Sequence, residues 1–465
     1  MKNRTKPSGI SNRKHRKTAL LAALLAAACL LPLLTGCSPQ SPSSYAIVKA
    51  QYPEMAPYPN EEDYFGLTGT FDDEGFSKVY DAWWENIQAQ RRPEGYADGL
   101  ETFFAASAQQ FLSGAGAGNQ IYSPLNVYMA LGMLAELTGG DSRQQILDVL
   151  GSQSIEALRS QASDLWNATY RQDGAVSSVL SSSLWLNQEI NFVPSTLDTL
   201  AETYYASSYQ GEMGSDGFNK ALQAWLNEQT GGLLEEQASQ IALSPDTILA
   251  LATTVFFQSK WSQEFNPSAT EAGTFHTPTG DRTCDFMHQS QSKNYYWADQ
   301  FSAVSQHLES DGSMWFLLPD EGMSVEELLA GGQAMDFILR DGDWENQKFL
   351  IVNQSIPKFD VTSQLDLKDG LQALGITDVF DPERSDYTPM TQDTDGIYLS
   401  KAQHDARVAI DEEGCAAAAY TVMANAGAAA PPEEEVDFVL DRPFLFAITS
   451  RDGLPLFVGV VNQPV

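Results

Sequence analysis

The feature that most constrains the fold is a long run of small residues near the carboxy terminus. Residues Gly414 to Glu435 read GCAAAAYTVMANAGAAAPPEEE, which has neither the period of an amphipathic helix nor that of a strand. Such a stretch indicates an exposed loop, and long loops inside a domain are usually functional or disordered. About thirty residues follow, too few to build a core alone. We therefore expect the tail to pair with the preceding sheet, and the loop to join two strands of one fold.

The amino-terminal residues have the pattern of a secretion signal. Seven Lys and Arg residues precede an uncharged apolar run from Ala19 to Leu34. This run is short for a membrane-spanning helix, which needs about 20 apolar residues. It ends in Leu34-Thr35-Gly36-Cys37, which resembles the bacterial lipobox. That resemblance implies acylation of Cys37 and a lipid-anchored, extracytoplasmic protein; a cleaved signal without lipid is the alternative, because Cys29 shows that cysteine also occurs here by chance.

The strong negative charge argues against a polyanionic partner. The formal charge is −34, and removal of the seven signal cations leaves −34 − 7 = −41. Nucleic-acid binding is therefore not expected. Beyond Cys37 the chain has two cysteines, Cys284 and Cys415, so we expect no disulfide framework. No residues have the spacing of metal ligands or of a catalytic nucleophile with its base. We therefore expect no bound metal, no cofactor and no enzymatic activity.

The chain divides into a signal (residues 1–36), a spacer (37–93) and one folded domain (94–465). The spacer is rich in Pro, Ser, Tyr and acidic residues, with a short helix expected around Lys78 to Gln90. In the domain, helical periodicity dominates first, and β-branched and aromatic runs dominate last. This order predicts an α+β fold with large, mostly antiparallel or mixed sheets. The helices are expected at 96–112, 125–137, 142–150 and 218–227, and the strands at 177–187, 248–258, 313–319, 349–361, 444–450 and 455–462.

From about residue 97 onward the chain resembles the serpin family in several separate stretches. Their order and spacing make the resemblance specific, whereas one match alone would be weak. The matching stretches are NQIYSPLNVYMALGMLAELTGGDSRQQI (119–146), FFQSKWSQEF (256–265), LQALGITDVF (371–380), IYLSKAQHDARVAIDEE (397–413), DRPF (441–444) and FVGVVNQP (457–464).

The resemblance implies a serpin-like fold of about nine helices and three β-sheets with an exposed reactive-centre loop at about 414–435. A serpin offers this loop to a protease, becomes acyl-linked to it on cleavage, and inserts the upstream half of the loop into its central sheet. The implied partner is thus a target protease in a covalent complex, with the inhibitor itself a monomer. Insertion requires small residues at the hinge, and the hinge positions are Glu412, Glu413, Gly414, Cys415, Ala416, Ala417, Ala418 and Ala419.

Strand periodicity gives the inserted loop two faces. Cys415 shares one face with the odd-numbered residues up to Met423, and Tyr420 lies on the other, which must be the solvent side. The segment from Gly414 to Gly427 contains no proline, which would break a hydrogen bond between strands, and no charged residue, which insertion would bury. The composition alone would equally suit a flexible or helix-prone tether. A thiol at the hinge could also act as a redox switch, although a small residue that happens to be cysteine is the simpler interpretation.

The cleaved bond is placed by counting along the loop. In inhibitory relatives it follows the hinge glutamate by about sixteen positions, which gives Ala428-Ala429 (412 + 16 = 428). Counting backwards from Phe438 instead gives Ala430-Pro431, because Glu433 to Glu435 lengthen the part of the loop after the bond. The residue before the cleaved bond is therefore expected within the window 426–430. Alanine suits the small specificity pocket of elastase or subtilisin, whereas trypsin-like pockets need Lys or Arg.

Two further sets of residues follow from the resemblance. His404, Ser123, Asn126 and Thr253 correspond to the network beneath the opening point of the central sheet. Asn126 and Thr253 depart from the usual residues, so they have either exchanged roles or leave room for a water. Glu412 and Lys358 are expected to pair where insertion begins, with Trp261 beside them, although each could be an ordinary surface or core residue.

Two functions compete. The first is an irreversible inhibitor of an extracellular serine protease, or of a cysteine protease, with small-residue specificity. The second is a non-inhibitory lipoprotein of the same fold that acts as a binding module. Small hinge residues favour the inhibitor, because non-inhibitory members often have charged, bulky or proline residues there.

Overall fold

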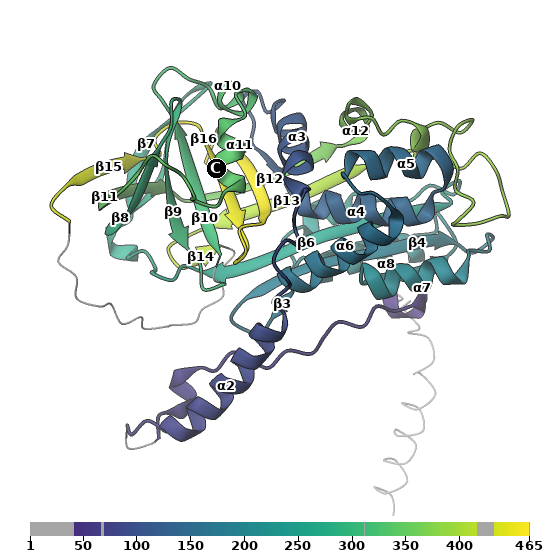
Figure 1. Cartoon of the computed structure of the whole chain (residues 1–465), viewed down its shortest axis with the longest axis horizontal. Helices are drawn as coiled ribbons and strands as arrows, with labels where there is room; N and C mark the ends of the chain where they lie inside the picture. The colour runs from purple at the N-terminus through teal and green to yellow at the C-terminus, as the bar shows by residue number, and fades with distance from the viewer. Residues whose placement is uncertain (1–40, 67–68, 311, 416–431, 465) are drawn as a thin grey trace, which may run out of the picture.

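The computed structural model describes residues 41–66, 69–310, 312–415 and 432–464. Cys37, the rest of the predicted signal and loop residues 416 to 431 lie outside the described residues. Figure 1 shows a long sheet with helices packed against it and a second, more twisted sheet at one end. The predicted α+β class is confirmed.

The helices are mostly in the first half of the chain, as their periodicity predicted. Several begin at residues suited to a helix start: Ser123 precedes Pro124 in α4, and the side chains of Ser154 and Ser215 cap α6 and α8. The α-helices are α2 (Asp73–Ala89), α3 (Leu100–Leu112), α4 (Pro124–Leu137), α5 (Gly140–Val149), α6 (Ile155–Thr169), α7 (Pro194–Thr203), α8 (Asp216–Gln229), α9 (Glu235–Ser239), α10 (Val325–Ala330), α11 (Gln333–Leu339) and α12 (Lys368–Leu374).

An eight-stranded sheet forms the middle of the molecule. Its order is β1-β5-β4-β6-β14-β13-β12, and β3 also pairs with β4. The strands are β1 (Ala46–Val48), β3 (Arg171–Gln172), β4 (Ser177–Asn187), β5 (Ala206–Gly211), β6 (Leu249–Lys260), β12 (Phe359–Asp366), β13 (Gln403–Ile410) and β14 (Gly414–Cys415). Strands from residues 46 to 415 therefore meet in one sheet.

A nine-stranded sheet contains the carboxy-terminal tail. Its order is β15-β11-β8-β9-β10-β16-β17-β2, with β7 paired to β8. The strands are β2 (Gln120–Tyr122), β7 (Glu271–Thr277), β8 (Gly280–Trp297), β9 (Phe301–His307), β10 (Ser313–Pro319), β11 (Gln347–Pro357), β15 (Glu435–Val439), β16 (Phe444–Thr449) and β17 (Pro455–Val461). The tail pairs into the preceding sheet as predicted, since β16 lies between β10 and β17.

The element counts differ from those that the resemblance implied. The described residues contain eleven α-helices and two sheets, where we expected about nine and three. Two of the expected sheets are continuous because β8 runs for 18 residues and pairs with β11 along most of its length and with β9 at its end. No described helix is long and apolar enough to cross a membrane.

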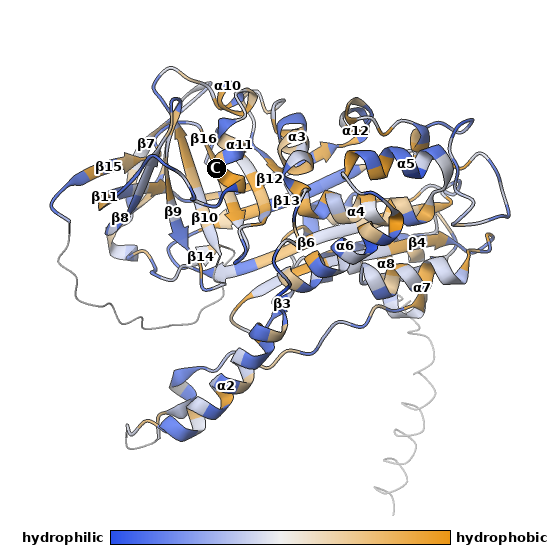
Figure 2. Cartoon of the chain, viewed as in Figure 1, coloured by the Kyte–Doolittle hydropathy of each residue, from blue (hydrophilic) through white to orange (hydrophobic). Residues whose placement is uncertain are grey.

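The core is apolar and rich in aromatic residues. Trp166, Tyr122, Phe316 and Phe446 are buried within one large cluster shared by both sheets and the helices. Figure 2 shows the tail strands β16 and β17 coloured as hydrophobic. These strands contribute two continuous buried runs, FLFAIT and PLFVGVV, which explains why they carry no polar alternation.

The segment that we expected to be a spacer is packed on the domain instead. β1 pairs with β5 at the edge of the sheet, and the ring of Tyr52 lies 5.2 Å from that of Trp166. The predicted short helix is α2, which begins earlier than expected and projects from the body (Figure 1). Its Trp83 donates a 2.8 Å hydrogen bond to the buried carboxylate of Asp173, which fixes this part of α2 to the domain. Burial of these aromatic rings is the physical reason why the segment is not free.

Candidate functional site

The central strands of the eight-stranded sheet leave room for one more strand. β6 pairs with β4 along Leu249–Gln258, but its other edge pairs only at Ser259 and Lys260, with β14. β13 pairs with β12 along its whole length, and its facing edge pairs only at Ile410, again with β14. Within the described residues, the remaining facing edges of β6 and β13 have no strand partner. Both strands are antiparallel to β14, so a continuation of β14 would pair with both.

A tight turn carries the chain from β13 into β14. The side chain of Asp411 accepts hydrogen bonds from the backbone N–H groups of Glu413 (2.9 Å) and Gly414 (3.2 Å), and its own N–H donates to the carbonyl of Gly414. Aspartate is well suited to such a turn because its short side chain reaches the backbone two or three residues on. Sequence reasoning did not identify Asp411, although Asp at the first position and Gly at the fourth position of a four-residue segment is a common turn pattern.

The first hinge residues are already part of the sheet. Gly414 lies opposite Lys260, and Cys415 lies between Ser259 and Ile410. A Cβ atom on Gly414 would lie 2.5 Å from the carbonyl oxygen of Ser259, so only glycine fits. The Cys415 side chain is buried in the main core, and burial, followed by the charge of Asp411, raises its thiol pKa to about 12. A thiol with so high a pKa is a poor nucleophile, which disfavours the redox hypothesis in this conformation.

Glu412 and Lys358 form the pair that we expected near the start of insertion. Lys358 Nζ lies 2.8 Å from Glu412 Oε2, and the hydroxyl of Thr270 donates to Glu412 Oε1 at 2.8 Å. Burial opposes ionisation of Glu412, but the hydrogen bonds from Lys358 and Thr270 lower its pKa on balance. The hydrogen bond to Glu412 raises the pKa of Lys358. Thr270 was missed because no sequence pattern links it to residue 412.

Trp261 anchors the same turn from the end of β6. Its indole N–H donates to the Asp411 carbonyl at 2.8 Å, and its backbone N–H donates to the Glu413 carbonyl at 3.0 Å. The side chain is 1% exposed. Trp261 therefore fastens the hinge turn to β6 and is also a core residue.

His404 is a buried neutral imidazole beneath the sheet. Its Nε2 accepts a 3.1 Å hydrogen bond from the backbone N–H of Ser123, and the ring of Tyr122 meets it edge-on. Complete burial lowers its pKa to about 4. The Ser123 hydroxyl accepts from the backbone N–H of Asn126, so it caps α4 and does not contact His404 through its side chain.

Asn126 and Thr253 contact each other directly. The Thr253 hydroxyl donates a 2.6 Å hydrogen bond to Asn126 Oδ1 and thereby links β6 to α4. No bridging water is needed at this distance. The two residues that depart from the usual pattern thus satisfy one another.

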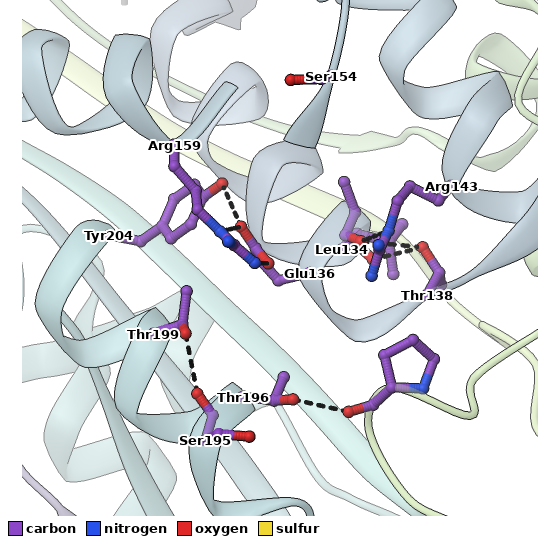
Figure 3. A network of polar contacts seen from close by, with 12 residues as sticks. Leu134, Glu136, Thr138, Arg143, Ser154, Arg159, Ser195, Thr196, Thr199 and Tyr204 are labelled. Atoms are coloured by element: carbon purple, nitrogen blue, oxygen red, sulfur yellow. Dashed lines mark hydrogen bonds and ion pairs between the residues drawn. The ribbon is translucent and has the colours of Figure 1, made fainter. Parts of the chain in front are cut away.

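The other end of α4 is held by a polar network (Figure 3). Glu136 is buried and makes a bidentate ion pair with Arg159, in which both N–O distances are 2.7 Å. The hydroxyl of Tyr204 also donates to Glu136, at 3.3 Å. A paired, hydrogen-bonded carboxylate can be buried without a large penalty. The helix below the opening point is therefore fixed at both ends.

A small cavity lies where β6 and β13 separate. Its volume is about 10 Å³, near that of one water probe, and Asn126, Val255 and His404 line it. Arg407 on β13 pairs with Asp360 and donates to the carbonyl of Leu233, which comes from the segment between α8 and α9. Leu233 and Leu234 of this segment line the cavity together with residues of β6 and β13.

Several predicted residues cannot be placed. Cys37, Ala416 to Ala419, Ala428 and Ala429 lie outside the described residues. Among the described ones, no group of His, Cys, Asp and Glu side chains could hold a metal ion.

Comparison with known proteins identifies the family. The family model described as Serpin (serine protease inhibitor) matches residues 100–464. The chain belongs to the serpin family. As expected for a serpin, it resembles curated relatives along most of its length. It is 30% identical to leukocyte elastase inhibitor from Sus scrofa over 75% of this chain and 94% of that protein. It is 28% identical to Serpin-ZX from Arabidopsis thaliana over 75% and 92% of the two chains.

Solved serpin structures share the fold. The native state of the thermophilic serpin tengpin superposes with a TM-score of 0.70 at 22% identity and covers 80% of this chain and 95% of its own. Thyroxine-binding globulin in complex with thyroxine gives a TM-score of 0.67 at 21% identity and covers 79% and 99%. At these identities the likeness concerns the fold alone.

Proposed function

We propose that this serpin is an irreversible inhibitor of an extracellular serine protease, or of a cysteine protease, that prefers small residues. The observation that carries the proposal is that, among the described strands, only β14 pairs with the facing edges of β6 and β13, with Gly414 and Cys415 between the ends of these strands. A strand that continues from Cys415 would gain hydrogen bonds on both sides and bury its odd-numbered face in the core, where Cys415 lies.

The chemistry of trapping follows from cleavage of the loop. The protease nucleophile attacks the carbonyl carbon of Ala428, the bond to the nitrogen of Ala429 breaks, and the new amino group leaves with a proton. The protease is then esterified, or thioesterified, to Ala428. Insertion of residues 416 to 428 would carry it up to about 43 Å at ~3.3 Å per residue. Water must deacylate this ester before insertion if the protease is to escape.

The proposed specificity rests on the loop sequence. No Lys or Arg occurs between Gly414 and Asp441, and alanine stands on both sides of the proposed bond. Leukocyte elastase inhibitors from Sus scrofa and Homo sapiens, which are 30% and 29% identical, are named for an enzyme of this preference. These names support elastase-like proteases as targets.

Incubation with pancreatic elastase and with subtilisin tests the proposal. The chain from Ser38 onward, which retains every described residue, should form an SDS-stable complex and release a peptide that begins at Ala429. The cleaved protein should unfold at a higher temperature than the native one, because the new strand completes the sheet. Rapid cleavage with neither a complex nor added heat stability would contradict it.

The alternative is a non-inhibitory serpin that binds a ligand or a surface. Thyroxine-binding globulin, whose structure contains thyroxine, shows that the fold also occurs in a ligand complex. The seated small-residue hinge favours the inhibitor, because a hinge that never inserts has no need for glycine against the β6 backbone.

We also propose that the chain is a lipoprotein anchored through Cys37. The basic stretch, the apolar run and the Leu-Thr-Gly-Cys sequence support this proposal. Expression in a bacterium fed an alkyne-labelled fatty acid should label the wild-type chain and leave Cys37→Ala unlabelled. Equal labelling of both, or of neither, would argue for another location.

A further inference from the structure

The helix α2 and the segment that precedes it form an arm that the shared serpin domain does not account for. We define the arm as residues 61–66 and 69–89, which comprise η2 (Glu61–Tyr64), the β-bridge between Phe65 and Phe71, and α2. The match to the serpin family model begins only at residue 100. Figure 1 shows that α2 projects from the body of the molecule. Any role of the arm must therefore come from its own residues.

A chain of aromatic rings runs along the arm. Phe65 contacts Phe71, with ring centroids 5.1 Å apart, and Phe71 contacts Phe76 at 5.4 Å. The chain continues from Phe76 to Tyr80 at 6.0 Å and from Tyr80 to Trp84 at 6.4 Å. These separations are typical of favourable ring contacts. The contacts stiffen the arm, so its surface is formed before a partner binds, and this reduces the entropy lost on binding.

Three of these rings remain exposed to solvent. Phe65 is 54% exposed, Tyr80 is 39% exposed and Trp84 is 38% exposed. They are three of the eight exposed large hydrophobic side chains in the part of the chain that the structure describes, and all three belong to the arm. The rings of Tyr80 and Trp84, one helical turn apart, are nearly parallel at 11°. Clustered exposed aromatic rings are common in surfaces that bind another molecule.

Carboxylates border the exposed rings. Asp81 and Glu85 follow Tyr80 and Trp84 by one position each, and both are exposed. Because residues four apart lie one above the other on a helix, the two rings form one row and the two carboxylates form a second row beside it. Residues 61–89 contain eight Asp and Glu residues and one Lys, which gives a formal charge of 1 − 8 = −7.

Exposed rings beside carboxylates fit a segment of another protein that is rich in Lys and Arg. A guanidinium or ammonium group can lie over the face of a ring while it pairs with the neighbouring carboxylate. From Asp73 to Glu85 the surface of α2 runs for about 18 Å at ~1.5 Å per residue, which matches about five residues of an extended chain. This length suits a polypeptide segment better than a single small cation.

The charge of the arm opposes the other occupants that an exposed apolar face could have. A second copy of the chain would bring a second arm with the same charge of −7, and like charges across an interface repel. The anionic headgroups of a membrane surface would repel the arm for the same reason. A cationic partner, by contrast, is attracted before contact, which raises its rate of association.

We infer that the arm is a docking site for a Lys- and Arg-rich segment of a partner protein. The segment lies across the rings of Tyr80 and Trp84 and pairs with the carboxylates of Asp81 and Glu85. None of these residues belongs to the hinge or to the sheet opening, so the inference goes beyond the proposed inhibition and does not depend on it. Such a site holds the serpin beside a cationic protein.

Binding of a fluorescein-labelled nona-arginine peptide to the chain from Ser38 onward tests the inference. The aromatic variant, Tyr80→Ala with Trp84→Ala, removes the ring faces and keeps every charge. The carboxylate variant, Asp81→Asn with Glu85→Gln, removes two charges and keeps every ring. Fluorescence anisotropy measures the dissociation constant of the peptide for each protein at low and at physiological salt.

Because the whole chain is acidic, each variant needs a control of the same chemistry on another surface. The aromatic control is Tyr398→Ala with Trp297→Ala, since these side chains are 48% and 40% exposed. The carboxylate control is Asp198→Asn with Glu202→Gln, which neutralises two exposed residues one turn apart on α7. General attraction between the acidic chain and the peptide would be weakened equally in a variant and in its control.

The expected result is a rise in the dissociation constant of about tenfold for the aromatic variant, because two ring faces are lost. The carboxylate variant should raise it by about fivefold at low salt and by less at physiological salt, where charges are screened. Both controls should stay within about twofold of the wild type. Nona-arginine should bind more tightly than nona-lysine, because a guanidinium group stacks on a ring and an ammonium group does not.

Three results would overturn the inference. Equal changes in the variants and their controls would show that the peptide is held by the general acidity of the chain. Wild-type dimers that the aromatic variant loses, measured by sedimentation velocity, would assign the rings to a second copy. Binding of the unlipidated chain to phosphatidylcholine vesicles that the same variant loses would assign them to a membrane. The carboxylate variant, which retains every ring contact, decides the outcome if circular dichroism shows that the aromatic variant has lost helix.

Discussion

At the scale of single residues, the buried polar groups around the sheet opening are satisfied in specific ways. His404 accepts from Ser123, Thr253 donates to Asn126, and Glu412 receives hydrogen bonds from Lys358 and Thr270. An unsatisfied buried polar atom costs about 1–3 kcal/mol, so each pairing matters to the native state. Each of these residues also lies at a boundary that insertion must disturb.

The titration of His404 makes a pH-dependent contribution to stability. Its folded pKa of about 4 is below the ordinary value of 6.5, so between these pH values the unfolded chain binds more protons. Stability from this group is therefore complete above pH 6.5 and is lost as the pH falls toward 4, by about 3 kcal/mol. Urea unfolding of wild type and of His404→Gln across pH 4 to 7 should give curves that diverge as the pH falls. Parallel curves would show that His404 is not the titrating group.

Gly414 controls access to the thiol beside it. In Gly414→Ala the added Cβ meets the backbone of Ser259 and Lys260, neither of which can move aside, so β14 should leave the sheet. Cys415 would then be exposed and its pKa would return toward the ordinary range, with alkylation at pH 8 faster by roughly tenfold or more. Mass spectrometry of iodoacetamide-treated protein measures this rate. Gly114→Ala, where a Cβ would meet nothing, is the control and should leave Cys415 protected.

At the scale of elements, β14 is the critical feature because it joins two halves of the sheet. β1, β5, β4 and β6 form one half, β13 and β12 form the other, and among the described strands only β14 pairs with both. Two residues of pairing are a weak link compared with ten between β4 and β6. The hinge turn, with Asp411, Glu412 and Trp261, adds the contacts that keep this link in place.

Reversal of the charge at Glu412 should weaken that link. In Glu412→Lys the ion pair with Lys358 is replaced by repulsion and the Thr270 hydroxyl loses its acceptor, at a cost of about 1–3 kcal/mol. The sheet should then open early and accept a strand from another molecule. Size-exclusion chromatography after mild heating should show polymers. Glu413→Lys is the matched control, since Glu413 is the exposed neighbour, and equal polymerisation of both variants would contradict the role of the pair.

At the scale of the whole molecule, the amino-terminal segment is part of the domain. Asp173, whose side chain is fully buried, accepts hydrogen bonds from Trp83 and from Arg171, and the Arg171 guanidinium also lies over the Trp83 ring. This contact fixes α2 to the turn between β3 and β4. Segments separated by ninety residues thereby become one unit.

Loss of Asp173 should release this contact. Asp173→Ala leaves Arg171 buried without its partner, which costs on the order of 3–5 kcal/mol. Urea unfolding should show that loss, and tryptophan fluorescence should report that Trp83 has become solvated. Asp164→Ala, which removes only a 4.0 Å contact with Arg92, should change stability by less than about 1 kcal/mol. Similar losses in the two variants would show that the Asp173 contact is not special.

Local patterns in the sequence predicted most elements but not how the amino-terminal segment packs. The runs at 177–187 and 313–319 are strands with the predicted bounds, because β-branched and aromatic residues favour buried strands. The Pro- and Tyr-rich segment around Tyr52 resembled a spacer by composition. The ring of Tyr52 is partly buried because Trp166 and Tyr205 pack against it, and composition carries no information about such distant partners.

The sequence by itself determined that a small-residue loop leaves and re-enters a single fold. A tail of two strands is too short to form its own core and must pack into the core of the preceding domain. It also determined that the hinge has small residues, a property of composition alone. Only the tertiary structure decided that Gly414 and Cys415 are already paired and that, within the part of the chain that the structure describes, the facing edges of β6 and β13 pair with β14 alone. The physical reason is that strand pairing depends on which edges are free, and here those edges come from segments about 150 residues apart.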